Sequence, residues 1–384
     1  MKIEPKILKG FRDFLPNEAR KRAYVLNTLK EVFESYGFEP LETPVLEYEE
    51  ILLGKYGDEG DKLMYRFEDN GKRKVAMRYD QTVPLARVVA QYANELLLPF
   101  KRYQIQNVYR ADNTQKGRYR EFLQVDVDTV GSRSTESDAE IISLVIDSFK
   151  KLGFKNFKVL INDRSSFEGI DKKAVTIIDK LEKIGNEGVI KELEANGYSP
   201  NLLDQVKNAK VPASLEFLKK AGVDESLLEF SPTLARGLDY YTGLILEVVA
   251  ADYTAGSLGG GGRYDDLIGM FGNQSIPAVG FAFGFDRIIE AMGEQNLFDD
   301  KDLGGTKVLV TNQGVEIANQ LRKKGINAEL YIDDKDMDKQ LRYADRKNIP
   351  FVLIVEGDKM KLKNMKTGEA KEVTLEDLPD EQLR

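Results

Sequence analysis

The side chains best suited to chemistry in this chain lie on one short segment, 121–130. Its residues alternate in character, so that on a β-strand Phe122, Gln124, Asp126 and Asp128 would share one face and apolar residues the other. Such a strand extends about 20 Å from Phe122 to Asp128, long enough to contact a nucleotide and an amino acid laid end to end. The same pattern is typical of the solvated face of an antiparallel sheet, so this segment alone leaves both interpretations open.

Three arginines just before this segment form a candidate phosphate site. Arg110 follows a strand predicted at 103–109, Arg118 and Arg120 lead into the polar segment, and Gly117 lies in the loop between them. A guanidinium group presents a fork of donors that matches phosphate oxygens. A basic hairpin that faces solvent is the alternative.

A second candidate anion site begins with an apolar strand predicted at 278–283. The chain passes through Gly284 into an amphipathic helix predicted at 285–292, and Arg287 would lie in the first turn of that helix. A helix N-terminus with an arginine favours negative charge. Many helices begin this way, so the pattern is weak alone.

The segment 236–243 combines a positive charge with two phenols. Arg236 precedes Tyr240 and Tyr241, and glycines flank them just before a predicted strand. A pair of core tyrosines is the alternative. The glycine run at 259–262 fits neither a P-loop nor a dinucleotide fingerprint, and we interpret it as a tight backbone approach between strands.

The composition excludes several kinds of catalyst. The 384 residues contain no His and no Cys. That removes Ser-His-Asp hydrolysis, imidazole acid–base catalysis, disulfides, and zinc or iron–sulfur sites built on these ligands. Trp is absent as well, and whether the sequence is natural or engineered stays open. The chemistry is left to Arg, Lys, carboxylates, Tyr, Gln and a bound metal ion, for which no protein ligands can be identified.

Length and hydropathy describe an ordinary globular protein of two or three domains, with 42% hydrophobic and 31% charged residues. The net charge of −8 argues weakly against a nucleic-acid partner, but RNA binding needs only a local basic face. No apolar run reaches the roughly 18 residues of a membrane span, and the first residues lack the apolar core of a secretory signal. We therefore expect no membrane segment and a cytoplasmic location.

The elements that must position these residues follow from the periodicity of apolar residues. Between about 164 and 222, Lys- and Glu-rich runs with turn residues predict a small helical insertion. After a break around 299–306, alternating strands and helices predict a small α/β domain. Further helices are predicted at 17–36, 137–152, 315–324 and 335–347, further strands at 75–79, 157–161, 244–250, 308–310 and 351–355, and an extended stretch at 38–45.

At these segments the chain resembles the histidyl-tRNA synthetase family over nearly its whole length. The element RGLDYYTG at 236–243 is specific to that family, whereas motif 3 alone would name only the class II aminoacyl-tRNA synthetases. The other similarities are an N-terminal signature at 9–16, motif 1 at 36–47, motif 2 and its loop at 109–128, a glycine-rich segment at 255–270, motif 3 at 280–287, the helical insertion of the archaeal and eukaryotic branch at 179–197 and an anticodon-binding domain at 307–378.

The resemblance implies an α+β fold, in which a class II antiparallel sheet is flanked by helices and accompanied by a helical insertion and a C-terminal α/β anticodon-binding domain. It divides the chain into a catalytic core at 1–163 and 223–298, the insertion at 164–222 and the anticodon-binding domain at 305–384. The implied activity is that of a histidine–tRNA ligase. The implied partners are histidine, ATP with Mg²⁺, tRNA(His), and a second copy of the chain that forms a homodimer through motif 1.

The resemblance also implies a histidine pocket. Asp80 and Thr82, together with Gln124, would hold the α-ammonium group, Asp128 would accept a hydrogen bond from the imidazole, and Tyr241 would engage its other nitrogen. A neutral imidazole has one donor and one acceptor nitrogen, so a carboxylate and a phenol can recognise both edges. The implied histidine-binding set is Asp80, Thr82, Gln124, Asp128, Arg236, Tyr240 and Tyr241.

The implied ATP site contains the arginines singled out above. Arg110 and Arg236 would stabilise the α-phosphate as catalytic residues, and Arg118 and Arg287 would bind the γ-phosphate. Phe122 would stack on adenine. No histidine side chain is needed for this chemistry.

Two alternatives to a ligase remain. The family includes a non-catalytic relative that acts as regulatory subunit of ATP phosphoribosyltransferase, and synthetase-like domains that sense uncharged tRNA. Such relatives typically lose phosphate-binding arginines or the anticodon domain, whereas Arg110, Arg118, Arg236 and Arg287 are all present here. A pure RNA-binding module would keep a basic patch without the histidine-binding set.

The sequence says least about which residues contact tRNA. The motif 2 loop at 111–117 blends the branches of the family, so its contacts with the tRNA acceptor end stay open. In the C-terminal domain, Lys339, Arg342 and Arg346 could form an RNA-facing patch, and a solvated face explains them equally well.

Overall fold

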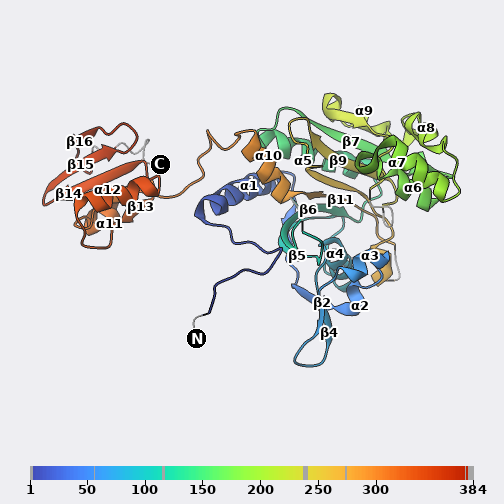
Figure 1. The fold of residues 1–384 in the computed structure, drawn as a ribbon, viewed down its shortest axis with the longest axis horizontal. Coiled ribbons are helices and arrows are strands. Elements are labelled where there is room, and N and C mark those ends of the chain that lie inside the picture. The colour runs from blue at the N-terminus through green and yellow to red at the C-terminus, as the bar shows by residue number, and fades with distance from the viewer. Residues whose placement is uncertain are drawn as a thin grey trace. The chain divides into compact units, whose positions relative to one another are not determined.

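A computed structural model describes residues 3–55, 57–114, 117–236, 241–272, 275–376 and 378. The chain divides into two compact units, Met1–Lys301 and Asp302–Arg384. Each unit has its own sheet and hydrophobic clusters, and each is described by itself (Figure 1).

A largely antiparallel sheet forms the centre of the first unit. Its strands are β1 (Glu39–Pro40), β5 (Phe100–Tyr109), β6 (Glu121–Val130), β7 (Phe157–Asp163), β8 (Leu228–Phe230), β9 (Leu244–Ala250), β10 (Gly259–Arg263) and β11 (Ala278–Phe283). Among the described residues they lie in the order β1-β5-β6-β11-β10-β9-β7-β8. Neighbours pair antiparallel except at the edges, where β1 is parallel to β5 and β8 is parallel to β7.

Two long helices cover the apolar face of this sheet, α1 (Pro16–Ser35) and α5 (Thr135–Leu152). Phe33 of α1 and Phe149 of α5 are fully buried, and their ring centroids lie 5.4 and 6.0 Å from that of Phe283 on β11. The aromatic residues therefore join both helices to the middle of the sheet. Figure 1 shows α1 and α5 beside β6 and β11.

The ends of α5 are set by local chemistry. The hydroxyl of Ser134 accepts a hydrogen bond from the backbone N–H of Glu136, which satisfies one of the free donors at the start of the helix. Gly153 ends the helix in the left-handed conformation with φ of 102°, which a residue without Cβ adopts at little cost.

The opposite face of the sheet carries a smaller layer. The helix α4 (Thr82–Gln91) packs its buried side chains against Val130 of β6 and against Tyr264, which follows β10. Nearby elements are the short helices α2 (Glu49–Leu52) and α3 (Gly57–Lys62) and a sheet in the order β2-β4-β3, formed by β2 (Leu46–Tyr48), β4 (Lys74–Met77) and β3 (Arg66–Glu68).

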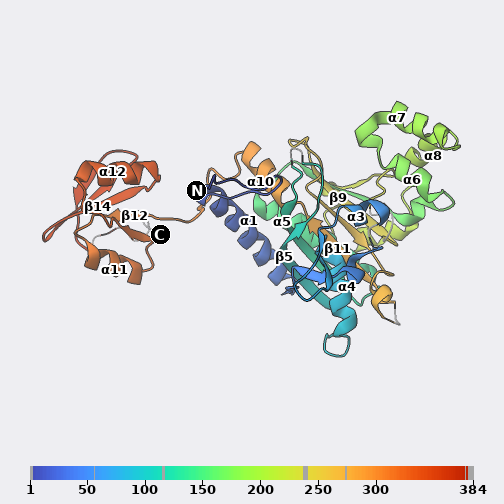
Figure 2. The same ribbon diagram turned by 60° about the horizontal axis from the view of Figure 1, so that its bottom comes forward.

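A run of helices connects β7 to β8. In Figure 2 the longer of these helices gather at one end of the first unit. They bury a cluster of their own that includes Val189, Leu193 and Leu203, and this cluster reaches Ile245 of β9. The helices are α6 (Lys172–Ile178), α7 (Leu181–Ala195), α8 (Leu202–Lys207) and α9 (Phe217–Lys220).

The second unit is a sheet with one helix on each side. The helix α11 contributes Ala318 and Leu321 to one apolar cluster, and α12 contributes Ala344 to another. Its elements are β12 (Val308–Val310), α11 (Val315–Lys323), β13 (Ala328–Leu330), α12 (Met337–Arg346), β14 (Phe351–Glu356), β15 (Lys359–Asn364) and β16 (Ala370–Glu372). The strand order is β13-β12-β14-β15-β16.

The α+β fold class expected from the sequence is confirmed, because an antiparallel sheet flanked by helices precedes a small α/β unit. The extended stretch expected at 38–45 is wrong as one element: only Glu39–Pro40 forms a strand there, and β2 begins at Leu46. No helix in the described part of the chain is both long and apolar enough to cross a membrane.

Candidate active site

The polar face of β6 is buried. Gln124, Asp126 and Asp128 expose less than a tenth of their surface, at 8, 3 and 4%. Their alternation with Val125 and Val127 is as expected, but the interpretation of this face as a solvated surface is wrong. The layer that contains α4 covers the face, which becomes the floor of a cavity.

This cavity of about 580 Å³ brings together most of the predicted site residues from distant parts of the chain. Tyr240 lies outside the described residues. The predicted residues that line the cavity are Asp80, Thr82, Arg110, Arg118, Phe122, Gln124, Asp128, Arg236, Tyr241 and Arg287. The alternative of a basic hairpin that merely faces solvent does not describe Arg110 and Arg118, because both line the cavity.

The cavity has room for these side chains because β10 carries almost none. A Cβ atom on Gly260 would lie 2.6 Å from a terminal nitrogen of Arg236. On the neighbouring strand β11, a Cβ atom on Gly280 would lie 2.0 Å from the carboxylate of Asp128. The glycine run is thus a tight backbone approach, as expected. Gly260 makes space for a cation, and Gly280 on β11 makes space for a carboxylate.

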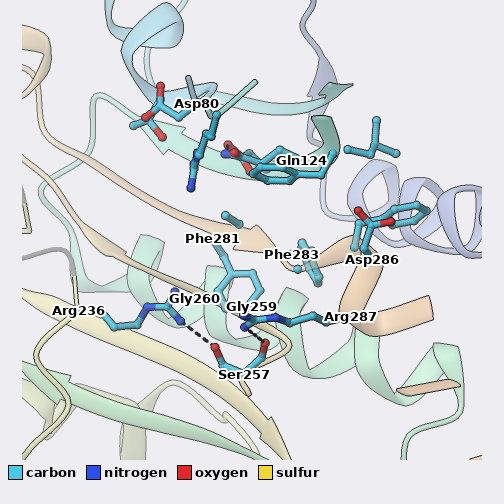
Figure 3. A pocket seen from close by; sticks show the side chains of 18 of the residues that line it. Asp80, Gln124, Arg236, Ser257, Gly259, Gly260, Phe281, Phe283, Asp286 and Arg287 are labelled. Atoms are coloured by element: carbon cyan, nitrogen blue, oxygen red, sulfur yellow. Dashed lines mark hydrogen bonds between the residues drawn. The ribbon is translucent and has the colours of Figure 1, made fainter. Parts of the chain in front are cut away.

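Two arginines in the cavity are joined through one residue. Arg287, in the first turn of α10 (Phe285–Glu294), donates from Nη1 to the backbone carbonyl of Ser257 at 3.0 Å. Arg236 donates from Nη1 to the Ser257 hydroxyl at 3.1 Å and to Glu247 at 2.6 Å. Figure 3 shows Ser257 between the two guanidinium groups.

The other two arginines come from the hairpin between β5 and β6. Arg110 donates from Nε to the backbone carbonyl of Tyr79 at 3.0 Å, and its guanidinium lies 5.2 Å from the ring centroid of Phe122. Arg118 pairs with Asp112 at 2.9 Å and remains about half exposed. These contacts orient both cations while leaving further N–H donors for a ligand.

A buried charge pair lies beneath the proposed histidine end of the cavity. Arg102 of β5 is fully buried, and its Nη2 lies 2.7 Å from Oδ2 of Asp128. The Tyr264 hydroxyl donates to the other oxygen of Asp128. Burial raises the pKa of Asp128, while the Arg102 charge and the Tyr264 hydrogen bond act in the opposite direction.

Asp126 is the second carboxyl on this floor. Burial raises its pKa to about 8, opposed by Arg102 and reinforced by Asp128. Its Oδ2 accepts a hydrogen bond from the Gln124 side-chain amide at 2.7 Å. Asp126 was placed on the polar face by its position in the sequence, but no role was assigned to it.

Sequence reasoning missed Arg102, Tyr264, Glu247 and Ser257. Arg102 lies directly opposite Asp128 across the β5–β6 pair, so the strand register was the signal that could have found it. Glu247 stands opposite Gly260 across β9 and β10 in the same way. Such pairings depend on register, which the spacing of residues within one strand does not reveal.

In the second unit, the three predicted basic residues lie on α12. Lys339, Arg342 and Arg346 are exposed and follow one another at spacings of three and four residues, so they share one face of the helix. Tyr343 is partly exposed beside them. Lys339 pairs with Asp336 at 3.3 Å.

Comparisons with known proteins give the family. A model of the histidyl-tRNA synthetase family matches residues 10–175 and 165–288, and a model of the anticodon-binding domain matches residues 304–383. The chain belongs to the histidyl-tRNA synthetase family. The resemblance read from RGLDYYTG and the class II motifs is therefore confirmed.

Members of the histidyl-tRNA synthetase family match the chain from end to end. It is 38% identical to the histidine–tRNA ligase of Cytophaga hutchinsonii, with 98% of each chain covered. It is 40% identical to the histidine–tRNA ligase of Phocaeicola vulgatus, with 100% of this chain and 99% of that protein covered.

Solved structures of the family share the fold. The crystal structure of histidyl-tRNA synthetase from Nostoc has a TM-score of 0.84 at 30% identity, with 99% of each chain covered. A structure from Bacillus halodurans, titled as an ATP phosphoribosyltransferase regulatory subunit/histidyl-tRNA synthetase, has a TM-score of 0.72 at 24% identity and covers 93% of this chain and all of that one. At that identity it shows the shared fold alone.

Proposed function

We propose that this protein is a histidine–tRNA ligase, which activates histidine with ATP and transfers it to the 3′ end of tRNA(His). One observation carries the proposal. Four arginines distant in sequence line a single cavity, and the same cavity contains a carboxylate and a phenol suited to an imidazole.

Histidine would occupy the end of the cavity next to Asp128. The Arg102 and Tyr264 contacts hold Asp128 in place, so that its carboxylate can accept from one imidazole nitrogen while Tyr241 engages the other. An amino acid without these groups would leave buried polar atoms unpaired, which rejects it strongly.

The α-ammonium group of histidine would bind at the start of α4. Asp80 and Thr82 line the cavity there, together with Gln124 of β6. The Asp80 side chain also accepts the backbone N–H of Val83 at 3.2 Å, which fixes the carboxylate relative to the helix. Carboxylate, hydroxyl and amide oxygens together offer acceptors for an ammonium group.

ATP would extend from Phe122 toward the arginines. Phe122 stacks on adenine, Arg110 and Arg236 contact the α-phosphate, and Arg118 and Arg287 contact the γ-phosphate. Mg²⁺ enters with ATP as part of the substrate. The described residues contain no group of three or more carboxylates that could bind a metal ion by themselves.

The reaction then needs positioning and charge stabilisation, with no side-chain base. The histidine carboxylate attacks the α-phosphorus, an oxygen–phosphorus bond forms, and pyrophosphate leaves with the bonding electrons. Arg110 and Arg236 stabilise the charge that develops on the α-phosphate. The terminal ribose hydroxyl of the tRNA next attacks the activated carbonyl and AMP leaves.

The remaining assignments follow the family. The catalytic core would consist of 1–163 and 223–298, with the insertion at 164–222 and the anticodon-binding domain at 305–384. Motif 1 would form a homodimer, Lys339, Arg342 and Arg346 would face the tRNA, and the protein would act in the cytoplasm.

ATP–pyrophosphate exchange with each of the twenty amino acids tests the proposal. Histidine alone should support exchange. Exchange with no amino acid would favour a non-catalytic regulatory role, and exchange with another amino acid would contradict the assignment of the pocket.

Arg236→Ala is the matching variant for the same assay. Loss of this donor should lower kcat by about 100-fold or more, equivalent to about 3 kcal/mol of activation free energy. Arg133→Ala is the control, because Arg133 is largely exposed and its ion pair with Asp265 is long, at 4.0 Å. Equal activity in the two variants would remove Arg236 from the mechanism.

A further inference from the structure

Asp126 is a buried carboxyl for which the proposed mechanism has no use. It lies between Gln124 and Asp128 on the polar face of β6 and lines the cavity. Its Oδ1 is buried and accepts no hydrogen bond from the described residues. A buried carboxyl oxygen without a hydrogen bond lowers the stability of the folded state, so its presence here needs a physical explanation.

The neighbouring strands give Asp126 no donor. Gln104 lies directly opposite on β5, but its amide nitrogen donates to the Thr43 hydroxyl at 2.8 Å and to Gln106 Oε1 at 2.6 Å. On the other side, β11 places Ala282 opposite Asp126. The Gln124 amide is thus the hydrogen-bond partner that the surroundings provide.

The contact with Asp126 fixes which way round the Gln124 amide lies. A side-chain amide has one donor end and one acceptor end. Because Nε2 donates to Oδ2 of Asp126 at 2.7 Å, the carbonyl oxygen is the end left for the cavity. An oxygen there attracts an ammonium group, whereas an NH2 group there would repel it. Figure 3 shows Gln124 on the same side of the cavity as Asp80.

We propose that Asp126 is a positioning residue for the amino-acid site, holding the Gln124 amide so that its oxygen faces the substrate ammonium group. The proposal rests on the proposed function, since it assigns the ammonium group of the substrate to this end of the cavity. Asp126 does not touch the substrate and acts through Gln124.

Ammonium binding is then coupled to the charge of Asp126. Burial raises the pKa of Asp126 most. Of the charged groups around it, Arg102 on β5 lowers the pKa, whereas Asp128 on β6 and Asp80 before α4 raise it further. A positive charge arriving at Gln124 and Asp80 favours the ionised form of Asp126. Binding therefore releases a proton, and by linkage histidine binds more tightly as the pH rises through the range in which Asp126 ionises.

Asp126→Asn in ATP–pyrophosphate exchange is the direct test. The asparagine amide can donate to the Gln124 oxygen and turn it away from the cavity. The histidine KM should rise about tenfold, as expected for one lost charge-assisted hydrogen bond, while the ATP KM stays unchanged. Between pH 6 and 8 the KM of the wild-type protein should fall more steeply than that of the variant. Titration of free histidine is common to both and cancels in the comparison.

Thr129→Val controls for general damage to β6. Thr129 is buried on the apolar face of β6, two residues after Val127, and it does not line the cavity. Its hydroxyl has no hydrogen-bond partner among the described residues. This variant should retain the wild-type histidine KM. A rise equal to that of Asp126→Asn would show a packing effect and overturn the proposal.

Gln124→Leu distinguishes positioning from any other role. Because Asp126 acts through the Gln124 amide, Asp126→Asn should add no further increase in histidine KM to the Gln124→Leu protein. Additive effects, or an unchanged KM and pH profile in Asp126→Asn alone, would overturn the inference. Absence of histidine-dependent exchange in the wild-type protein would instead contradict the proposed function.

Discussion

At the scale of single residues, the charges beneath the cavity do not balance when every group is ionised. Arg102 is the fully buried cation, and Asp126 and Asp128 are two buried carboxyls within its reach. Charge is expensive inside a protein, so one proton shared by the two carboxyls is the cheaper state. Burial raises the pKa of both groups, and the charge of Asp128 raises the pKa of Asp126 further.

This imbalance predicts how stability depends on pH. The pKa of Asp126 is about 8 in the folded protein against an ordinary value of 3.8, so between these values the folded state carries a proton that the unfolded state has lost. The free energy of unfolding should therefore fall as pH rises from about 5 to 8, with a slope from this group approaching 1.4 kcal/mol per pH unit.

Urea unfolding of the wild-type protein and of Asp126→Asn, followed by circular dichroism at a series of pH values, measures this slope. The variant should be less sensitive to pH over the same range. Identical slopes would mean that Asp126 is ionised throughout.

Single residues also show how far the sequence alone could go. Arg110, Arg236, Arg287 and Asp128 were singled out because their types and flanking glycines suggested ligand binding or because the family motif contains them, and all line one cavity. Arg102 and Tyr264 were not found. Their importance comes from facing Asp128 across strand pairings and a turn, which residue types along the chain do not encode.

At the scale of elements, the cavity accounts for the glycine strand β10 in the middle of the sheet. Gly260 of β10, together with Gly280 and Ala282 of the neighbouring strand β11, adds almost no side-chain atoms to the cavity. Glycine weakens a strand because it loses more backbone freedom on folding than any other residue. This cost leaves space for Arg236 beside Gly260, and Gly280 on β11 leaves space for Asp128 in the same way.

Gly260 and Gly261 should respond differently to the same substitution. In Gly260→Ala the new Cβ meets the end of the flexible Arg236 side chain at 2.6 Å, which can move aside. We expect near-normal stability but a kcat reduced by up to about 100-fold, because a displacement of about 1 Å at a catalytic group has such effects.

In Gly261→Ala the new Cβ would lie 2.0 Å from the backbone oxygen of Gly280, which cannot move without separating β10 from β11. We expect the free energy of unfolding to fall by about 3 kcal/mol or more. Thermal unfolding and exchange kinetics of both variants check the pair. Equal loss of stability in Gly260→Ala would show that β10 tolerates no Cβ on either face.

Regular elements were predicted well where periodicity and caps agree. The helix expected at 137–152 is α5, and the strand expected at 121–130 has the bounds of β6. α4 was not predicted. Its sequence TVPLARVVAQ opens with two β-branched residues and a proline, so its intrinsic helix propensity is weak. Packing against Tyr264 and neighbouring apolar residues stabilises the helix instead.

At the scale of the whole molecule, the chain consists of two units that bury separate clusters. Apolar clusters of the first unit include Leu85 and Val130 in one and Val189 in another, while those of the second include Val310 and Val352. The sequence showed a break around 299–306, and the units separate between Lys301 and Asp302. The boundaries of the insertion at 164 and 222 stay a prediction.

Separate clusters predict two unfolding transitions in calorimetry. On the proposed function, histidine and ATP bind in the cavity of the first unit. At concentrations about 100 times their Kd they should therefore stabilise only that transition, by about 2.7 kcal/mol for each independently bound ligand. The temperature of the second transition should not change. A single transition that moves as one would show that the units unfold together.

Ser257 contacts the two arginines that we propose bind the same polyphosphate. Its hydroxyl accepts from Arg236 and its backbone carbonyl accepts from Arg287. A free arginine side chain carries about 2 kcal/mol of rotamer entropy, part of which would be lost when a nucleotide immobilises it. The contacts with Ser257 already restrict both side chains without a ligand, so on the proposed function less of this entropy would be lost when ATP binds.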